Sequence, residues 1–246
     1  MTRSGRIHSY ETLGTLDGPG IRTVFFLQGC PLRCLYCHNP DTWDLSGGKS
    51  WSISSLMNII EKYRFYYEAS DGGVTVSGGE PALQPEFVFD FFKACQQKGI
   101  HTALDTSGLV DSKTAELCLA HADLVLLDLK HMNNPDHIKL TGQNNQQALS
   151  FARLAESKQI PLWIRQVLLP GWTDTKKQLL DLADFCSTLS TLQKLEVLPY
   201  HRLGIHKWEK LNLAYPLKDI APPTEKQVRQ AVQVLKTAHP ALPVLS

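Results

Sequence analysis

Three cysteines lie within the eight-residue segment CPLRCLYC, as Cys30, Cys34 and Cys37. The apolar run TVFFL at 23–27 precedes this segment, so the thiols are expected on a loop that follows a strand. Thiolate sulfur is a soft ligand that selects zinc, copper(I) or iron-sulfur centres over magnesium or calcium. The next cysteine along the chain is Cys95. Three thiolates leave one position of a metal centre open, and a small molecule can bind and react there.

The other three cysteines, Cys95, Cys118 and Cys186, are scattered among apolar neighbours in stretches with a helical pattern. Free cysteine in such surroundings behaves as a small hydrophobic core residue. Six cysteines distributed in this way do not form the dense framework of a disulfide-rich secreted domain. The cluster of three is therefore the part of the cysteine content that predicts chemistry.

Composition excludes several classes of partner. The 25 Lys and Arg residues nearly balance 24 Asp and Glu residues, so the net charge of +1 offers no strong field for nucleic acid or an anionic membrane. Residues 1–14 are polar and lack the apolar stretch of a signal peptide, and no apolar run approaches the ~20 residues of a membrane span. We expect a cytoplasmic protein that binds neither nucleic acid nor a membrane.

Strands and helices alternate along the chain. Short runs rich in apolar and β-branched residues predict six strands, at 21–27, 73–76, 101–104, 124–129, 161–169 and 195–198. Stretches of helical length and period separate or follow them, at 54–67, 85–98, 112–121, 146–158, 176–190 and 224–238. Strands that each precede a helix are expected to run parallel, in a barrel or in a doubly wound sheet.

The polar residues follow the strands at their carboxyl ends. They are the cysteine segment after the first strand, Ser77-Gly78-Gly79-Glu80 after the second, Asp105-Thr106 after the third, Asp128 and Lys130 at the fourth, and Tyr200-His201 after the sixth. Barrel enzymes build their sites on that face. We predict an α/β fold, a partial (β/α)6 TIM-like barrel with its site at the C-terminal ends of the parallel strands. Residues 1–246 would form one domain, with the barrel at about 20–200 and a C-terminal loop and helix at 202–246.

A family resemblance covers nearly the whole chain. Its motifs are DGPGIRTVF at 17–25, Gly29-Cys30, the second and third cysteines, YCHNP at 36–40, LPYH at 198–201 and HKW at 206–208. With them, the chain resembles the activating enzymes of glycyl radical enzymes, which belong to the radical S-adenosylmethionine superfamily. No cysteine lies between Cys37 and Cys95, where many members carry extra clusters. The resemblance is therefore to the branch whose partner is pyruvate formate-lyase.

The resemblance implies one 4Fe-4S cluster held by Cys30, Cys34 and Cys37, with S-adenosylmethionine at the open iron. In this family the reduced cluster cleaves S-adenosylmethionine to methionine and a 5′-deoxyadenosyl radical. That radical takes a hydrogen atom from a glycine of the partner enzyme. A protein of this kind tunes the cluster, orients the cofactor and excludes competing reactions. The resemblance further implies flavodoxin or a similar low-potential protein as the electron donor.

The resemblance also implies roles for residues outside the cluster. The expected contacts of S-adenosylmethionine are Tyr36, His38, Gly79, Asp128, Leu129, Lys130 and His201. A cationic Lys130 suits the carboxylate of that cofactor. Asp105 and Thr106 are candidates for holding a monovalent cation. Asp17 and Arg165 are candidates for contact with the partner's glycine loop, and a structural ion pair is the alternative for Arg165 because a buried cation needs a partner.

Alternatives remain at this point. A zinc site with His38 as fourth ligand is one, although zinc ligands usually come as separated C-x2-C pairs. A radical enzyme that acts on another glycyl radical enzyme or on a small molecule would carry similar cluster residues. Asp128, Asp105 and Thr106 could also be ordinary caps of strand ends. Residues 202–223 are expected to form a long loop, which is either a lid or ordinary surface packing.

Overall fold

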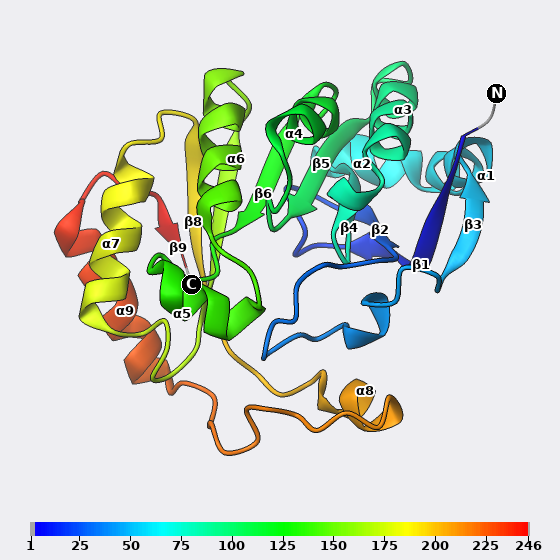
Figure 1. Ribbon diagram of the computed structural model, residues 1–246. Helices are drawn as coiled ribbons and strands as arrows, with labels where there is room; N and C mark the ends of the chain where they lie inside the picture. Colours follow the sequence, from blue (N-terminus) through cyan, green and yellow to red (C-terminus); the bar gives the residue numbers. More distant parts are fainter. Residues whose placement is uncertain (1–2, 246) are drawn as a thin grey trace. The chain divides into compact units, whose positions relative to one another are not determined.

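A computed structural model describes residues 3–245 (Figure 1). The described chain divides into two compact units, residues 3–31 with 42–126 and residues 32–41 with 127–245. Among these described residues, no helix combines the length and the apolar character needed to cross a membrane. The two units are described in turn.

The first unit is built on strands in the order β3-β1-β2-β4-β5. Antiparallel pairing joins β1 (Ser4–Gly14) to β2 (Arg22–Leu27) and to β3 (Lys49–Ser52). Parallel pairing joins β2 to β4 (Gly73–Gly78) and β4 to β5 (His101–Thr106). The central strands are buried over most of their length, as expected of parallel strands covered on both faces.

The helices of the first unit lie between its strands, or after the last of them, along the chain. They are α1 (Ile53–Ile60), α2 (Arg64–Ser70), α3 (Pro85–Gln96) and α4 (Ser112–Leu119), with 3-10 turns at Glu61–Tyr63 and Pro81–Leu83. The side chain of Ser52 caps α1 and that of Asp111 caps α4, each by accepting a backbone N–H of the first turn. Phe87, Phe91 and Phe92 of α3 are buried in the core.

The second unit holds β7 (Leu162–Leu168), β8 (Leu192–Pro199) and the short β9 (Val244–Leu245), all paired in parallel. Its helices are α5 (Asn134–Thr141), α6 (Gln146–Ser157), α7 (Lys176–Ser187), α8 (Ile205–Lys210) and α9 (Glu225–Ala238). A 3-10 turn spans Pro40–Thr42 at the border of the units. Alternate residues of β7 are buried, so one face of this strand packs against the core.

The border between the two units falls within the strand β6 (Leu124–Asp128), after Leu126. Backbone hydrogen bonds flank it on both sides. Asp123 donates to Thr102 of β5 at 3.1 Å, and Leu129 donates to Arg165 of β7 at 3.0 Å. In neither unit do the strands return to close a barrel. The predicted α/β fold with a partial barrel of parallel strands is confirmed.

The six predicted strands and six predicted helical stretches are all present, and the structure adds five elements. These are β1, β3, α5, α8 and β9. The predicted helix at 54–67 is divided by the 3-10 turn, where Tyr63 leaves the helical region with φ −110° and ψ 6°. The expectation of a single domain over 1–246 stays a prediction, and its residues 1, 2 and 246 lie outside the described residues.

Replacing Phe91 by Ala should lower the free energy of unfolding by about 3–5 kcal/mol, because a large buried ring leaves a cavity. Phe91 is fully buried and meets Phe25 edge-on, with ring centroids 5.5 Å apart. The matched control is Phe65→Ala on α2. The Phe65 side chain is 74% exposed, so its loss should change stability by less than about 0.5 kcal/mol. Chemical denaturation of both variants measures the difference, and equal losses would contradict the placement of this core.

Candidate active site

The loop that carries Cys34 and Cys37 is held by the end of α5. The last carbonyls of a helix have no partner inside the helix. Here the N–H of Arg33 donates to the carbonyl of Thr141 at 2.8 Å, and the N–H of Leu35 donates to Leu140 at 3.0 Å. The N–H of Cys37 closes a turn on the carbonyl of Cys34 at 3.0 Å. Backbone contacts therefore shape this loop.

A charged pair lies beside the same loop. The ammonium Nζ of Lys130 is 3.0 Å from Oδ2 of Asp128, and their side chains are 11% and 30% exposed. The ammonium also lies 5.8 Å from the ring centroid of Tyr36. Burial alone would lower the pKa of Lys130, but Asp128, Tyr36 and Cys34 outweigh it and hold this pKa well above its usual range. Lys130 is therefore a permanent cation next to the cysteine loop.

Burial dominates the acid-base behaviour of the loop. It raises the pKa of the Cys34 thiol, and the charge of Lys130 opposes that shift. Burial likewise raises the pKa of the Tyr36 hydroxyl. A bound metal deprotonates a coordinating thiol outright, since its charge exceeds that of any neighbouring side chain. The donor set, soft sulfur next to a fixed cation, fits an iron-sulfur cluster, whose ligands are thiolates.

The helix α8 fastens the far end of the loop. The indole N–H of Trp208 donates to the carbonyl of Cys37 at 2.8 Å. The ammonium of Lys207 donates to Oδ1 of Asn39 at 2.7 Å and lies 3.1 Å from Oδ2 of Asp41. The segment at 202–223, read from sequence as a lid or as surface packing, thus packs on the residues after Cys37. Sequence reasoning assigned no role to Lys207 or Trp208, although both belong to the HKW motif.

The rings of His38 and His201 are in contact in the second unit, with centroids 4.2 Å apart and planes tilted by 38°. Nε2 of His38 donates to the backbone carbonyl of His201 at 3.1 Å. Gly204 approaches His38 so closely that a Cβ there would lie 2.7 Å from the His38 Cα. The structure thus brings the predicted residues of this unit together in two sets, Cys34, Tyr36, Asp128 and Lys130 in one and His38 with His201 in the other.

In the first unit, Gly79 lies against the turn that precedes Cys30. The N–H of Gly79 donates to Leu27 at 2.9 Å, and the N–H of Glu80 donates to Gly29 at 2.7 Å. A Cβ on Gly79 would lie 2.1 Å from the carbonyl oxygen of Gly29 and 3.3 Å from the Cβ of Cys30. Glycine is required here because two backbones touch. The Gly-Gly pair is therefore a structural device for placing Cys30, whatever else it contacts.

Glu80 is fully buried, and its carboxylate accepts hydrogen bonds from residues at the end of β5. It accepts hydrogen bonds from the Thr106 hydroxyl at 2.5 Å, from the N–H of Ser107 at 2.9 Å and from the N–H of Ala82 at 3.0 Å. The hydroxyl of Ser77 donates to Oδ2 of Asp105 at 2.6 Å. These bonds fix the predicted cation candidates Asp105 and Thr106 as strand-end residues. Their role toward a cation stays a prediction.

Arg22 anchors the loop that contains Asp17. Its side chain is fully buried and donates to the Thr75 hydroxyl and to the carbonyl of Val74, each at 2.6 Å, and to the carbonyl of Pro19 at 3.1 Å. Burial lowers the pKa of Arg22 to about 10, with the charge of Asp17 acting against that shift. Arg22 stays cationic at neutral pH. Sequence reasoning quoted it within the DGPGIR motif but gave it no separate role.

Arg165 lies on the face of β7 that turns away from α7. Its neighbour in sequence, Gln166, contacts Gln178 of α7, and successive residues of a strand point to opposite faces. Nε of Arg165 is 3.8 Å from Oε2 of Glu196 on β8. Glu196 also pairs with Lys194 at 2.5 Å. The structural ion pair expected as one alternative for Arg165 is present, and contact with a partner stays a prediction.

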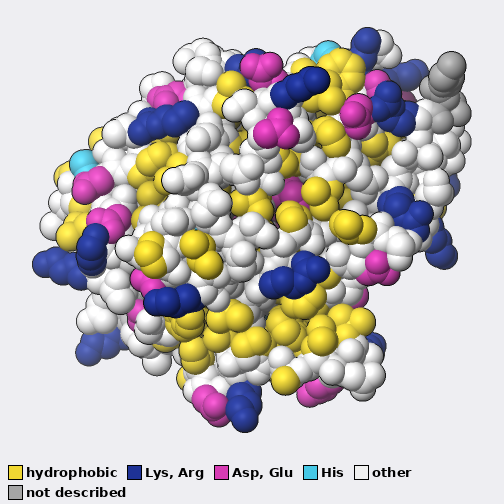
Figure 2. All heavy atoms as spheres, viewed as in Figure 1, with side chains coloured by type: hydrophobic (Ala, Val, Ile, Leu, Met, Phe, Trp, Pro, Cys, Tyr) yellow, Lys and Arg dark blue, Asp and Glu magenta, His cyan; other side chains and the backbone are white. Residues whose placement is uncertain are grey.

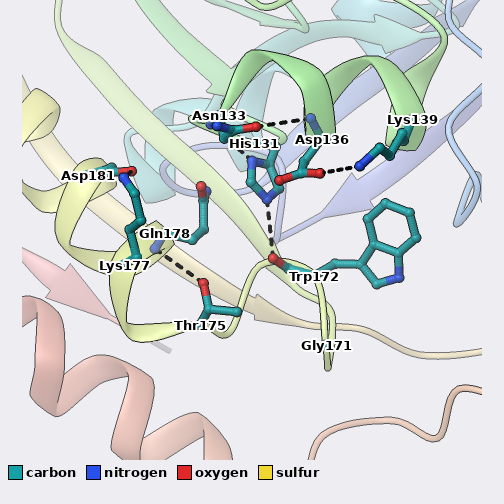
Figure 3. A pocket seen from close by; sticks show the side chains of 10 residues that line it. All are labelled: His131, Asn133, Asp136, Lys139, Gly171, Trp172, Thr175, Lys177, Gln178 and Asp181. Atoms are coloured by element: carbon teal, nitrogen blue, oxygen red, sulfur yellow. Dashed lines mark hydrogen bonds and ion pairs between the residues drawn. The ribbon is translucent and has the colours of Figure 1, made fainter.

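A cavity of about 330 Å³ opens beside the segment that follows Lys130 (Figure 3). His131, Asn133, Trp172 and Gln178 are among its lining residues. Its cations are already neutralised, Lys139 by Asp136 at 2.9 Å and Lys177 by Asp181 at 2.7 Å. None of the residues predicted to bind the cluster or its cofactor lines this cavity, so it is separate from the predicted set.

Within the described range 3–245, no group of three or more His, Cys, Asp or Glu side chains is arranged to hold a metal ion. A single ion draws its ligands to one point at bond lengths of about 2.0–2.3 Å. An iron-sulfur cluster instead takes one thiolate on each of several iron atoms, so its ligands are spread more widely. The soft sulfur donors of the loop therefore indicate which kind of metal centre it would hold.

Hydrophobic side chains gather at the lower edge of Figure 2, where Figure 1 draws α8. Leu203, Leu211 and Leu213, which flank α8, are all exposed. Exposed apolar side chains that gather in this way are typical of protein contact surfaces.

Replacing Gly79 by Ala should lower the free energy of unfolding by about 1–3 kcal/mol, because its Cβ collides with the backbone of Gly29. The iron content after anaerobic reconstitution should also fall, since Cys30 must move. The control is Gly99→Ala, where a Cβ meets nothing within 4 Å although φ is 66°. That control should cost about 1–2 kcal/mol and keep its iron. A Gly79→Ala protein with unaltered stability and iron content would contradict the steric argument.

Acidification should destabilise the metal-free protein between about pH 7 and pH 5. Burial lowers the pKa of His101, His131 and His137 below the ordinary value of 6.5. The unfolded chain then binds more protons than the folded chain as the pH falls through this range, so the free energy of unfolding falls with it. Urea denaturation at pH 5, 6, 7 and 8 measures the trend. A constant or increasing stability on acidification would be the contrary result.

Comparison with known proteins identifies the family. The profile of the radical SAM superfamily matches residues 24–185. The chain is 47% identical over 234 residues to a pyruvate formate-lyase-activating enzyme of Staphylococcus epidermidis, covering 92% of this chain and 93% of that one. A relative of the same name from Staphylococcus aureus gives the same values.

Solved structures agree with this kinship. A domain of a pyruvate-formate lyase-activating enzyme from Bacteroides vulgatus is 30% identical, with a TM-score of 0.59 over 71% of this chain and 98% of that one. A radical SAM methyltransferase from Sphaerobacter thermophilus shares the fold alone, at 14% identity and a TM-score of 0.66 over 96% of this chain and 76% of that one. The chain therefore belongs to the radical SAM superfamily and, within it, to the family of pyruvate formate-lyase-activating enzymes.

Proposed function

We propose that this protein is the oxidoreductase that activates pyruvate formate-lyase by generating a glycyl radical on it. The observation that carries the proposal is the partly buried Lys130 cation beside the Cys34–Cys37 loop, in a chain 47% identical to enzymes of that name. A cation at this place suits a carboxylate ligand next to a thiolate-bound cluster. The rest of the proposal assigns the remaining residues around this pair.

Cys30, Cys34 and Cys37 would hold one 4Fe-4S cluster, with S-adenosylmethionine as its ligand and co-substrate. The cluster, when bound and reduced, would supply one electron to the sulfonium of S-adenosylmethionine, whose S–C5′ bond would break to give methionine and a 5′-deoxyadenosyl radical. That radical would take a hydrogen atom from the partner's glycine and become 5′-deoxyadenosine. The chain keeps the cysteine loop in place through Thr141, Leu140 and Trp208.

Lys130 would bind the carboxylate of S-adenosylmethionine, because two of its three N–H donors remain after Asp128 has taken one. Asp128 keeps that ammonium oriented. Burial alone would raise the pKa of Asp128, but Lys130 and Arg165 outweigh it and hold this pKa below its usual range. The other proposed contacts of the cofactor are Tyr36, His38, Gly79, Leu129 and His201.

The partner's glycine loop would contact Asp17 and Arg165. Each is held by its own unit, Asp17 by the loop that Arg22 anchors and Arg165 by the strand β7. The exposed leucines around α8 would add apolar contact with the surface of pyruvate formate-lyase. Asp105 and Thr106 would help to hold a monovalent cation near the cofactor.

The remaining assignments concern the setting of the enzyme. The electron donor would be flavodoxin or a similar low-potential protein, and neither nucleic acid nor a membrane takes part. The six free cysteines suit the cytoplasm, where thiols are kept reduced. One functional domain over 1–246 is supported by the superfamily match, since residues 24–185 include parts of both units.

The anaerobically reconstituted protein should bind about four irons per chain and should cleave S-adenosylmethionine when reduced. Mixed with pyruvate formate-lyase, it should produce a glycyl radical signal in electron paramagnetic resonance. Replacing Cys34 by Ala should abolish both cleavage and radical formation because the cluster loses a ligand. The control Cys118→Ala lies in the core of α4 and should retain both activities.

Each outcome separates one assignment from the others. Cleavage without a glycyl radical on pyruvate formate-lyase would keep the radical chemistry and overturn the partner. One zinc and no iron in anaerobically purified protein would overturn the enzyme itself. Equal loss of cleavage in the Cys34 and Cys118 variants would overturn the division of the cysteines into ligands and core residues.

A further inference from the structure

We propose that Gln166 and Gln178 are positioning residues that set the place of Lys130 and thereby the affinity for S-adenosylmethionine. The inference rests on the proposed function, because it takes Lys130 as the residue that binds the carboxylate of that cofactor. It is carried by a set of buried amide side chains that bind the backbone directly after β6. No part of this set is needed to form the strands or helices themselves.

Residues 130–132 lie outside the strands and helices, so their backbone groups need other partners, whereas the carbonyl of Asn133 already accepts the N–H of His137 in α5 at 2.9 Å. Buried backbone groups must be satisfied nevertheless. The carbonyl of Lys130 accepts from Nε2 of Gln166 at 3.1 Å. The N–H of Met132 donates to Oε1 of Gln178 at 3.0 Å. Side chains from β7 and α7 therefore replace the missing backbone partners of this segment.

The two glutamines also bind each other. Nε2 of Gln178 donates to Oε1 of Gln166 at 3.1 Å. Gln178 is 2% exposed and Gln166 is 1% exposed. Each of these atoms then has one partner of the opposite kind, so neither amide can rotate without setting two donors or two acceptors against each other. The pair forms a directed relay from Met132 through Gln178 and Gln166 to the carbonyl of Lys130.

Further contacts hold the next residues of the same segment (Figure 3). Nδ2 of Asn145 donates to the carbonyls of His131 at 3.1 Å and Met132 at 2.6 Å. Nε2 of His131 donates to the carbonyl of Trp172 at 3.2 Å, and its Nδ1 accepts the N–H of Asn133 at 3.0 Å. These contacts fix residues 131–133. Within this set of described side chains, Gln166 of the glutamine pair is the one that contacts the backbone carbonyl of Lys130.

Such a pair is costly where stability alone is concerned. Burying an amide without full compensation costs free energy, and two apolar side chains could fill the space between β7 and α7. The two buried amide side chains are explained if the function requires a fixed position of the Lys130 backbone. The Lys130 ammonium sits at 3.0 Å from Asp128 and at 5.8 Å from the Tyr36 ring, and a shifted backbone would move it away from both.

The test compares Gln166→Leu and Gln178→Leu with wild type. Both variants keep the approximate volume and remove the relay. The dissociation constant of S-adenosylmethionine, measured on cluster-loaded protein, should rise about 10-fold, since displacements of about 1 Å cost up to 100-fold. In cluster-free protein, hydrogen exchange should accelerate locally in residues 129–133. Leu182→Ala, a buried change on the same helix, controls for a general loss of stability.

A double variant decides whether the effect acts through Lys130. Lys130→Met should itself weaken binding of S-adenosylmethionine, and adding Gln166→Leu should then cause no further loss. Additive losses, or losses matched by Leu182→Ala, would overturn the positioning role. So would unchanged affinity in both glutamine variants, or in Lys130→Met. A wild-type protein that binds S-adenosylmethionine but forms no glycyl radical would instead overturn the proposed function and leave the inference standing.

Discussion

Lys130 brings a positive charge to a partly buried place in the second unit, where its side chain is 11% exposed. Asp128 lies 3.0 Å from its ammonium, the Tyr36 ring and the Cys34 thiol lie beside it, and these groups together keep it charged. A buried ion pair contributes little to stability, because desolvation offsets the attraction of the charges. Its place in this fold is better explained by a ligand. The ammonium of Lys130 interacts electrostatically with the Cys34 thiol of the cysteine loop.

Two kinds of backbone support keep that arrangement. The cysteine loop uses the free carbonyls at the end of α5, which every helix must satisfy in some way. The segment after Lys130 uses the buried amides of Gln166 and Gln178. In the first unit, Gly79 and Glu80 do the same for the turn before Cys30. The proposed cofactor residues Cys30, Cys34 and Lys130 thus depend on backbone contacts made by their neighbours.

The sequence predicts the parallel strands well because their apolar runs are short, dense and bounded by polar residues. It predicts the candidate site residues because they stand at strand ends, and because the cysteine spacing and the DGPGIR motif identify the family. The antiparallel strand β1 was not predicted. Much of β1 is exposed, and its side chains give no apolar alternation beyond the buried Ile7. The short helix α8 has too few residues for a helical period to be seen.

Residues that support the site are the hardest to predict, and the reason is physical. Trp208 acts through one hydrogen bond to the carbonyl of Cys37, a residue far away in the sequence. Gln166 stands within a strand pattern as an ordinary polar residue, and only its contact with Gln178 gives it a partner. A hydrogen bond to a backbone carbonyl leaves no trace in residue type or spacing. A catalytic motif therefore shows which groups react, whereas the tertiary structure is needed to show what holds them at the required place.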